Sequence, residues 1–165
     1  MEKKGWKEGR KDQENERVVR TYAGMVYRLA YARTGNRSDA DDIFQEVFLR
    51  YIKRPPICET EEHRKAWLIR VTINCAAKFH RSFWQRFTGP MEEEGAGTKQ
   101  KDIDLSDQLR KLPEKYRILI HLFYYERFSV EDIANITGRK QSTVRTQLTR
   151  ARRALRKIME EEGHV

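Results

Sequence analysis

The chain has 165 residues, of which 36% are charged and 38% hydrophobic, and its formal net charge is +9 with a pI near 9.7. This length suits one ordinary domain or two small ones. The basic balance favours a polyanionic partner, with nucleic acid ahead of an acidic lipid surface. No apolar run approaches the ~18 residues that would span a bilayer, and the N-terminus lacks the apolar core of a secretion signal. We therefore expect a cytoplasmic protein with no direct membrane insertion.

The residue types that usually carry catalysis or bind metals are scattered along the chain. Cys58 and Cys75 stand apart, with no Cys-x-x-Cys pair and no His at ligand spacing, which argues against a metal site or a disulfide. Cys75 is most simply a small buried side chain, whereas Cys58 falls in a loop. The chain has no Gly-rich phosphate loop, nucleophile elbow or His-Glu-x-x-His motif. We expect no enzyme activity, no cofactor and no small-molecule substrate.

The N-terminal third predicts a tail and two helices. Residues 1–13 are rich in Lys, Glu, Asp and Gly, and this composition predicts a disordered basic tail. Apolar residues recur at helical spacing over 14–33, which predicts a first amphipathic helix. Ser38 and Asp41 form a possible capping box for a second helix that ends at the Pro55-Pro56 break.

The second predicted helix has one apolar and one acidic face. Its polar stripe comprises Asp41, Asp42, Gln45 and Glu46, with Leu49 following. Acidic residues early in a helix also complement its dipole, and that alternative explains Asp41 but not Glu46, which lies beyond the first turn. On a basic nucleic-acid binder, this stripe is better interpreted as a surface that docks on a protein.

A third helix is predicted over residues 61–87. Its core stripe comprises Leu68, Val71, Cys75, Phe79, Phe83 and Phe87. Another face carries Trp67, Arg70, Asn74, Lys78 and Arg81. An aromatic ring, an amide and cations together suit opened nucleic acid, because bases stack on the ring and cations neutralise phosphates. The alternative is an ordinary helix with Trp67 in the core and solvated basic residues.

Periodicity is lost over residues 88–104, where Gly, Pro and charged residues predict a linker. A second domain is predicted over 105–159, with helices at 106–111 and 113–125 followed by a helix-turn-helix. Its shared core comprises Ile118, Leu119, Leu122 and Phe123. No sustained strand pattern or long repeat occurs. The fold class is therefore all-α, with two small helical domains joined by a flexible linker and a helix-turn-helix in the C-terminal one.

The stretch from Ser129 to Lys157 predicts this helix-turn-helix. Ser129 with Asp132 makes a capping box, and Gly138 supplies the turn before a second helix that begins near Gln141. On this second helix, the packing face comprises Val144, Leu148, Ala151 and Leu155, and the opposite face comprises Ser142, Arg145, Thr146, Thr149 and Arg153.

The segment from Ile133 to Met159 has eight Lys or Arg residues and no Asp or Glu, which indicates an anionic partner. The candidate DNA contacts are Arg139, Lys140, Gln141, Ser142, Thr143, Arg145, Thr146 and Thr149. We expect Arg145 on a base edge, with Gln141 as a second reader and the hydroxyls partly on phosphate. The alternative is a basic helix that is merely exposed to solvent.

Three stretches in order carry a family resemblance: DADDIFQEVFLR, HRKAWLIRVTIN, and the segment from Leu112 to Arg156. Together they resemble a bacterial RNA polymerase sigma factor of the extracytoplasmic function (ECF) class. The resemblance implies a factor that binds core RNA polymerase and promoter DNA and directs promoter-specific initiation. It also implies an N-terminal domain (14–87) that reads the downstream element, named −10, and a C-terminal domain (105–159) that reads the upstream element, named −35.

The resemblance further assigns individual residues. It implies that Asp42, Gln45, Glu46 and Leu49 dock on the polymerase clamp, and that Asn74 with Arg70, Lys78 and Arg81 meets the opened strand. The loop 55–60 matches a segment that captures an extruded base. An anti-sigma factor is a further implied partner. Two rival hypotheses are a stand-alone helix-turn-helix regulator that acts without polymerase, and an interaction module that binds polymerase without directing initiation.

Overall fold

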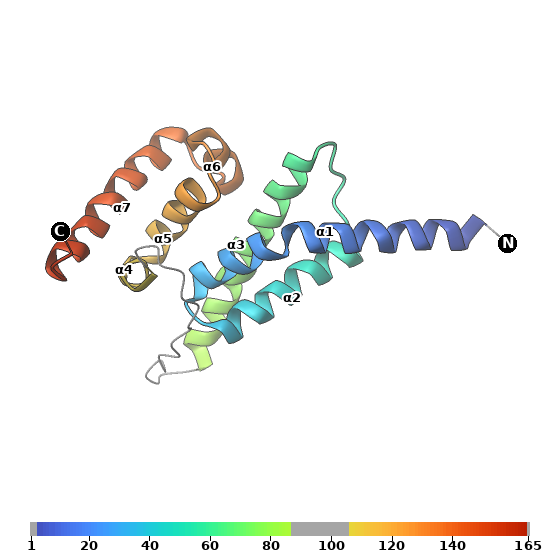
Figure 1. The fold of residues 1–165 in the computed structure, drawn as a ribbon, viewed down its shortest axis with the longest axis horizontal. Helices are drawn as coiled ribbons and strands as arrows, with labels where there is room; N and C mark the ends of the chain where they lie inside the picture. The colour runs from blue at the N-terminus through green and yellow to red at the C-terminus, as the bar shows by residue number, and fades with distance from the viewer. Residues whose placement is uncertain (1–2, 87–105, 165) are drawn as a thin grey trace.

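The computed structural model describes residues 3–86 and 106–164, with side chains at 8–78 and 107–164. Within these ranges every regular element is helical (Figure 1), which confirms the predicted all-α class. The N-terminal domain has helices α1 (Lys3–Thr34), α2 (Arg37–Lys53) and α3 (Glu61–Arg86). The C-terminal domain has α4 (Ser106–Lys111), α5 (Glu114–Ile120), a π-helical turn η1 (His121–Tyr125), α6 (Val130–Thr137) and α7 (Gln141–Glu161). None of these helices is apolar over a length that could cross a bilayer.

Helix α1 is longer than the sequence predicts. Residues 3–13, for which the composition predicts a disordered tail, continue the helix away from the rest of the molecule (Figure 1). From residue 8 to 13 the side chains are exposed, so no core packing holds this part. Once the amphipathic segment is helical, each added residue gains one backbone hydrogen bond, and Lys, Glu and Arg have high helix propensity. Propagation from a packed helix therefore accounts for the difference.

Helix α2 begins two residues earlier than predicted, at a different cap. The Asn36 Oδ1 atom accepts a hydrogen bond from the Asp39 backbone N–H at 2.8 Å, and Ser38 lies inside the helix. The predicted Ser38–Asp41 capping box is therefore wrong. Gly35 has a φ of 75° and reverses the chain between α1 and α2, which places Asn36 rather than Ser38 at the cap position.

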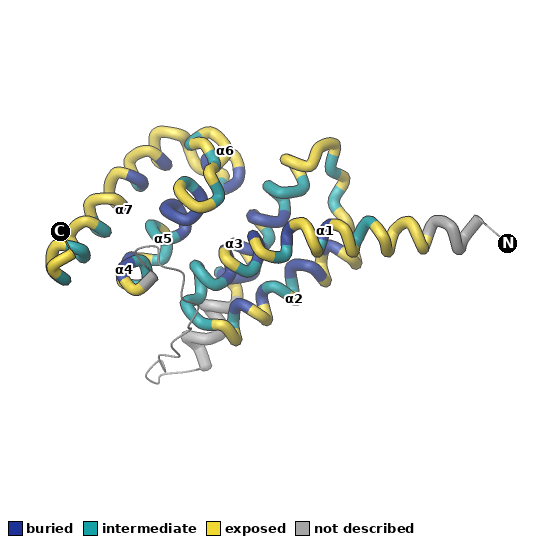
Figure 2. Tube along the Cα trace, viewed as in Figure 1, coloured by how far each residue is buried: buried dark blue, intermediate teal, exposed yellow. Residues whose placement is uncertain are grey.

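The three N-terminal helices share one apolar core (Figure 2). Its fully buried members include Val18, Val26 and Leu29 of α1, Ile43 and Val47 of α2, and Leu68 and Ile69 of α3. Cys75 is also buried, as the sequence predicts, and Val71 is half-buried. The side chains of Phe79, Phe83 and Phe87, which complete the predicted core stripe, lie outside the described residues.

The helix-turn-helix forms as predicted. The Ser129 Oγ atom accepts from the Asp132 N–H at 3.1 Å, and the Asp132 carboxylate accepts from the Ser129 N–H at 3.2 Å, so the capping box is closed. Gly138 ends α6 with a φ of 68°. Upstream, the predicted helix 113–125 is α5 continued by η1, in which the hydrogen-bond register widens by one residue.

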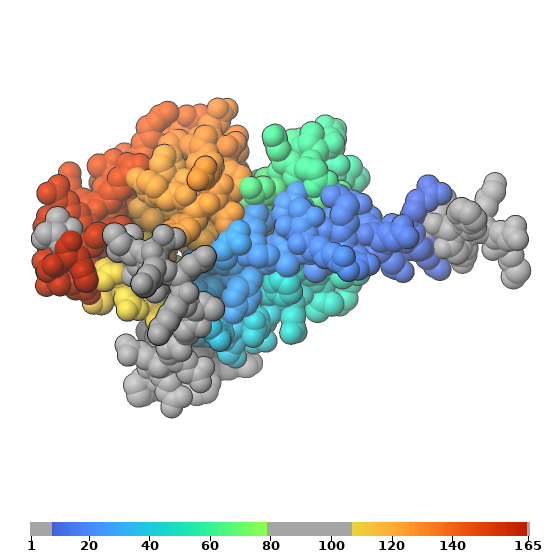
Figure 3. Space-filling view, in the orientation of Figure 1, coloured from blue at the N-terminus to red at the C-terminus, as the bar shows by residue number. Residues whose placement is uncertain are grey.

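The two domains pack against each other. Helix α1 contacts α5 and α3 contacts α6, and the apolar core runs without a break from the N-terminal domain to Ile118, Leu119 and Ile133. The space-filling view shows this close contact between the blue N-terminal and orange C-terminal parts (Figure 3). We call this arrangement the closed form.

Candidate nucleic-acid and polymerase interfaces

Helix α7 separates a packing face from an exposed polar face. Val144, Leu148 and Ala151 are buried, and Leu155 is half-buried. The predicted DNA contacts from Arg139 to Thr149 are all exposed, and so is Arg153. Because the buried positions recur every three or four residues, they fix which side of α7 faces outward. The structure therefore gathers the predicted upstream-element residues on one surface.

Hydrogen bonds hold several of these side chains in place. The Arg145 Nη2 atom donates to Gln141 Oε1 at 3.3 Å, so the two candidate base readers contact each other. Thr146 and Thr149 donate to the carbonyls of Ser142 and Arg145, each at 3.0 Å. Arginine and glutamine side chains match the acceptor and donor patterns of guanine and adenine edges. This surface can therefore read base pairs in a major groove.

Gln147 is a residue that the sequence analysis missed. It is half-buried, and its Oε1 atom accepts a hydrogen bond of 2.7 Å from Arg139 Nη1. This contact ties the turn before α7 to the second turn of the helix. On the helical wheel Gln147 lies at the edge of the packing face, three residues after Val144, so the spacing gave no signal for a role beside the predicted polar face. Gln147 thereby orients a cation that we predict to contact DNA.

The residues predicted to contact opened DNA from α3 do not all have the same environment in the structure. Trp67 is half-buried and packs edge-on against Tyr51, with ring centroids 5.9 Å apart. It belongs to the core, as the alternative interpretation held. Arg70, Asn74 and Lys78 are exposed in the complete chain, whereas the side chain of Arg81 lies outside the described residues.

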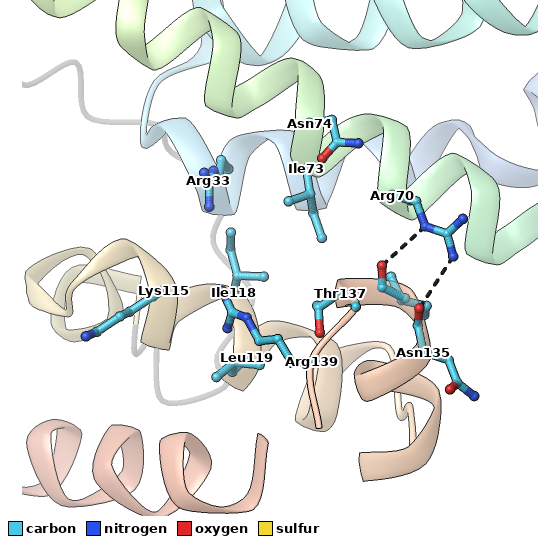
Figure 4. Close-up of a pocket in the computed structure, with 12 residues that line it drawn as sticks. Arg33, Arg70, Ile73, Asn74, Lys115, Ile118, Leu119, Asn135, Thr137 and Arg139 are labelled. Atoms are coloured by element: carbon cyan, nitrogen blue, oxygen red, sulfur yellow. Dashed lines mark hydrogen bonds between the residues drawn. The ribbon is translucent and has the colours of Figure 1, made fainter. Parts of the chain in front are cut away.

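Arg70 contacts the C-terminal domain in the closed form, although the residue remains exposed. Its Nε atom donates to the Ile136 carbonyl at 3.3 Å and its Nη2 atom to the Asn135 carbonyl at 3.4 Å (Figure 4). Both carbonyls lie in the last turn of α6, where carbonyl groups lack partners within the helix and attract cations. A side chain predicted to contact opened DNA is thus held by the other domain.

The outward face of α2 carries acidic and apolar residues together. Asp41, Asp42 and Gln45 are exposed, and Glu46 pairs with Arg50 at 2.6 Å. Leu49 is 48% exposed. Ile52, which the sequence analysis did not single out, is 41% exposed and lies one turn further along the same helix. Large apolar side chains in an acidic surround are typical of a protein-docking surface.

Among the residues with described side chains, ion pairs connect the domains at two places. Arg28 Nη2 lies 3.2 Å from Glu126 Oε1, and Arg33 pairs with Glu114. The Glu126 side chain is only 7% exposed, and His121 Nε2 lies 3.4 Å from the same carboxylate oxygen. The contact with His121 lowers the pKa of Glu126 below its usual value, Arg28 adds to this effect, and burial opposes it. Glu126 is therefore ionised and linked to both domains.

The described residues contain no group of three His, Cys, Asp or Glu side chains that could hold a metal ion. Cys58 is half-buried and Cys75 buried, and both are free thiols. The surfaces described above can bind anionic polymers and a protein partner.

Two family models match the chain. Sigma-70 region 2 matches residues 18–86, and sigma-70 region 4 matches residues 103–155. The chain belongs to the sigma-70 family of RNA polymerase sigma factors. It falls in the ECF class, and it directs promoter-specific initiation rather than acting as a stand-alone regulator.

Curated sigma factors resemble the chain over most of its length. RNA polymerase sigma factor SigV of Bacillus subtilis is 33% identical over 137 residues, which cover 79% of this chain and 81% of the relative. ECF RNA polymerase sigma factor SigL of Mycobacterium tuberculosis is 28% identical over 153 residues and 86% of each chain.

Two solved structures share the fold. RpoE of Bartonella quintana, in complex with the anti-sigma factor NepR, has a TM-score of 0.74 at 20% identity and covers 90% of this chain and 98% of its own. CnrH, in complex with the cytosolic domain of CnrY, has a TM-score of 0.67 at 18% identity and covers 91% and 90%.

Proposed function

We propose that this sigma factor holds core RNA polymerase through the outward face of α2 and reads two promoter elements with its two domains. Residues 14–87 would read the downstream element through Arg70, Asn74, Lys78 and Arg81. Residues 105–159 would read the upstream element through the exposed face of α7, and residues 88–104 would link the two. The observation that carries this proposal is the separation of charge: an acidic and apolar face on α2, and a basic face on α7 that has no carboxylate from Gln141 to Met159.

This separation matters because phosphates repel carboxylates. From Gln141 to Met159, α7 presents cations and no acidic residue, so it attracts DNA. The carboxylates of α2 would keep that face off DNA and leave it for a protein. A chain whose purpose was only to bind DNA would gain nothing from exposed Leu49 and Ile52.

We infer that the chain catalyses no reaction itself. Core polymerase would catalyse RNA synthesis, and the chain would position the polymerase at the promoter. Because polymerase and chromosome share the cytoplasm of a bacterium, the chain would act there. A similar fold occurs in a complex with an anti-sigma factor, and this likeness supports an anti-sigma partner for the present chain as well.

The decisive experiment adds the purified chain to sigma-free core polymerase and maps transcript starts on genomic fragments. Starts at defined sites are expected. Matched variants separate the two surfaces: Leu49→Asp should abolish binding to core polymerase, whereas Arg145→Ala should leave that binding intact and impair promoter choice. Defined starts that persist unchanged in both variants would contradict the proposal.

A further inference from the structure

A cavity of about 570 Å³ lies between the two domains (Figure 4). Its walls come from α1 and α3 on one side and from α5, α6 and the turn after α6 on the other. Cavities of this size hold small ligands in other proteins. Because neither domain supplies all of the walls, the complete cavity exists only in the closed form.

Positive charge gathers around this cavity. Arg33, Arg70, Lys115 and Arg139 line it, and Arg33 and Arg139 lie on facing sides of the gap (Figure 4). Among the described ion pairs, only Arg33 of these four has a carboxylate partner, Glu114. Burial lowers the pKa of Arg33, and the positive charge of Arg139 lowers it further, whereas the negative charge of Glu114 raises it. These like charges repel one another, and a bound anion would relieve that repulsion.

The cavity also has an apolar floor. Ile73 projects from α3 and Ile118 from α5 toward the same space, with Leu119 beside Ile118 (Figure 4). Ile136 also lines the cavity. The Asn74 side chain lies at the edge and offers both a hydrogen-bond donor and an acceptor. An inorganic anion would leave this floor unused. A ligand with a flat apolar ring and a short chain of phosphates would use both parts.

We propose that the interdomain cavity binds a nucleoside diphosphate, with its phosphates between Arg33 and Arg139 and its base over Ile73 and Ile118. Guanidinium groups bind phosphate oxygens with paired hydrogen bonds, which makes them suited to this task. The ligand binds only the closed form, and it therefore shifts the chain toward that form. Arg70, Asn74 and Arg139 are also proposed DNA contacts, so the ligand competes with the promoter. This regulatory consequence rests on the proposed function, whereas binding itself does not.

Binding is measured on the full chain without polymerase or DNA, by calorimetry with ADP and GDP at physiological salt. The matched variants are Arg139→Gln at the cavity and Arg150→Gln on exposed α7, because each removes one positive charge from a surface position. We expect Arg139→Gln to weaken nucleotide binding about tenfold and Arg150→Gln to leave it unchanged. Arg33→Gln is a second cavity variant with the same expected loss.

Three results would overturn the proposal. One is equal binding by Arg139→Gln and Arg150→Gln, which would indicate general attraction to a basic chain. Another is binding of inorganic pyrophosphate as tightly as ADP and GDP, because the apolar floor would then contribute nothing. The third is nucleotide binding that appears only when Glu92, Glu93 and Glu94 are all replaced by Gln. In that case the anion that the cavity binds would be the chain's own acidic run and not a nucleotide.

The regulatory consequence has a separate readout. Dyes at Cys58 and at an Arg153→Cys substitution report the separation of the domains. At a nucleotide concentration of 100 times Kd, the ratio of closed to open form should rise about a hundredfold, because a ligand specific to one state stabilises it by mass action. An unchanged ratio despite binding would contradict a ligand confined to the closed form. If initiation at promoters were absent while nucleotide closed the chain, only the proposed function would fail.

Discussion

Replacing Arg28 by Gln should open the closed form. Arg28 reaches from α1 to Glu126 of the C-terminal domain, at 3.2 Å. The Arg28 side chain is 56% exposed and that of Glu126 is 7% exposed, so solvent screens the pair from one side only. An exposed ion pair contributes up to about 1 kcal/mol to stability, and disrupting a buried one costs about 3 to 5 kcal/mol. The contribution of a half-exposed pair lies between these values. We expect a loss near 1 kcal/mol, since His121 still contacts Glu126.

A loss of about 1 kcal/mol changes the ratio of closed to open form about fivefold. The assay is energy transfer between dyes at Cys58 and at an Arg153→Cys substitution. Labelling favours these positions because Cys75 is buried and burial raises the pKa of its thiol, which keeps it protonated. Arg20→Gln is the matched control, since Arg20 also pairs on α1 but with Glu16 of the same helix. Equal open fractions in the Arg28 and Arg20 variants would refute this reasoning.

Three further outcomes are expected. Arg145→Ala should lose about 1 to 3 kcal/mol of discrimination at one base pair of the upstream element, measured by binding to a series of substituted promoters. Ser129→Ala removes the cap of α6 and should lower the free energy of unfolding of the C-terminal domain by about 1 kcal/mol, measured by denaturant titration. Glu61 has its pKa lowered to about 2, chiefly by the hydrogen bond from Tyr22, so its contribution to stability is full above its unfolded pKa and declines as pH falls toward 2. Below about pH 4.5, protonation of Glu61 removes part of the stability of the wild-type chain. Glu61→Gln has no carboxylate at this position, so its stability should fall less over this pH range, as measured by thermal unfolding.

Each of these has a matched control. Arg156→Ala, on the same helix but beyond the proposed contacts, should leave the base preference intact, and uniform weakening by Arg145→Ala would make that residue a phosphate contact instead. Ser129→Thr retains a capping hydroxyl and should restore most of the stability lost in Ser129→Ala. Glu59→Gln, at an exposed position nearby, should keep the wild-type acid profile, and an identical profile for Glu61→Gln would contradict the role of the Tyr22 contact.

Local signals in the sequence predicted local structure well. The Ser129–Asp132 box and Gly138 were correct because both depend on backbone groups within a few residues. The cap of α2 was ambiguous, since Asn36 with Asp39 and Ser38 with Asp41 have the same spacing, and only the reversal at Gly35 decides between them.

Long-range features could not be read in the same way. The contact of Arg28 with Glu126 joins residues 98 positions apart, and no periodicity encodes it. Trp67 lay beside cations on a helical wheel, yet its ring packs on Tyr51 because α2 approaches from that side. Whether a residue near the edge of an apolar stripe is buried depends on the neighbouring helix, which sequence spacing alone does not place.

The contact between Arg70 and the end of α6 sets an order of events. Under the proposed function, Arg70 would have to release the carbonyls of Asn135 and Ile136 before its Nε and Nη2 atoms could meet the opened strand, so strand reading would follow separation of the domains. The acidic face of α2 is exposed in the closed form, and the proposed docking on polymerase could therefore precede separation of the domains. A surplus of unassembled chains would then leave promoters vacant, and the number of assembled complexes, rather than the number of chains, would set the level of transcription.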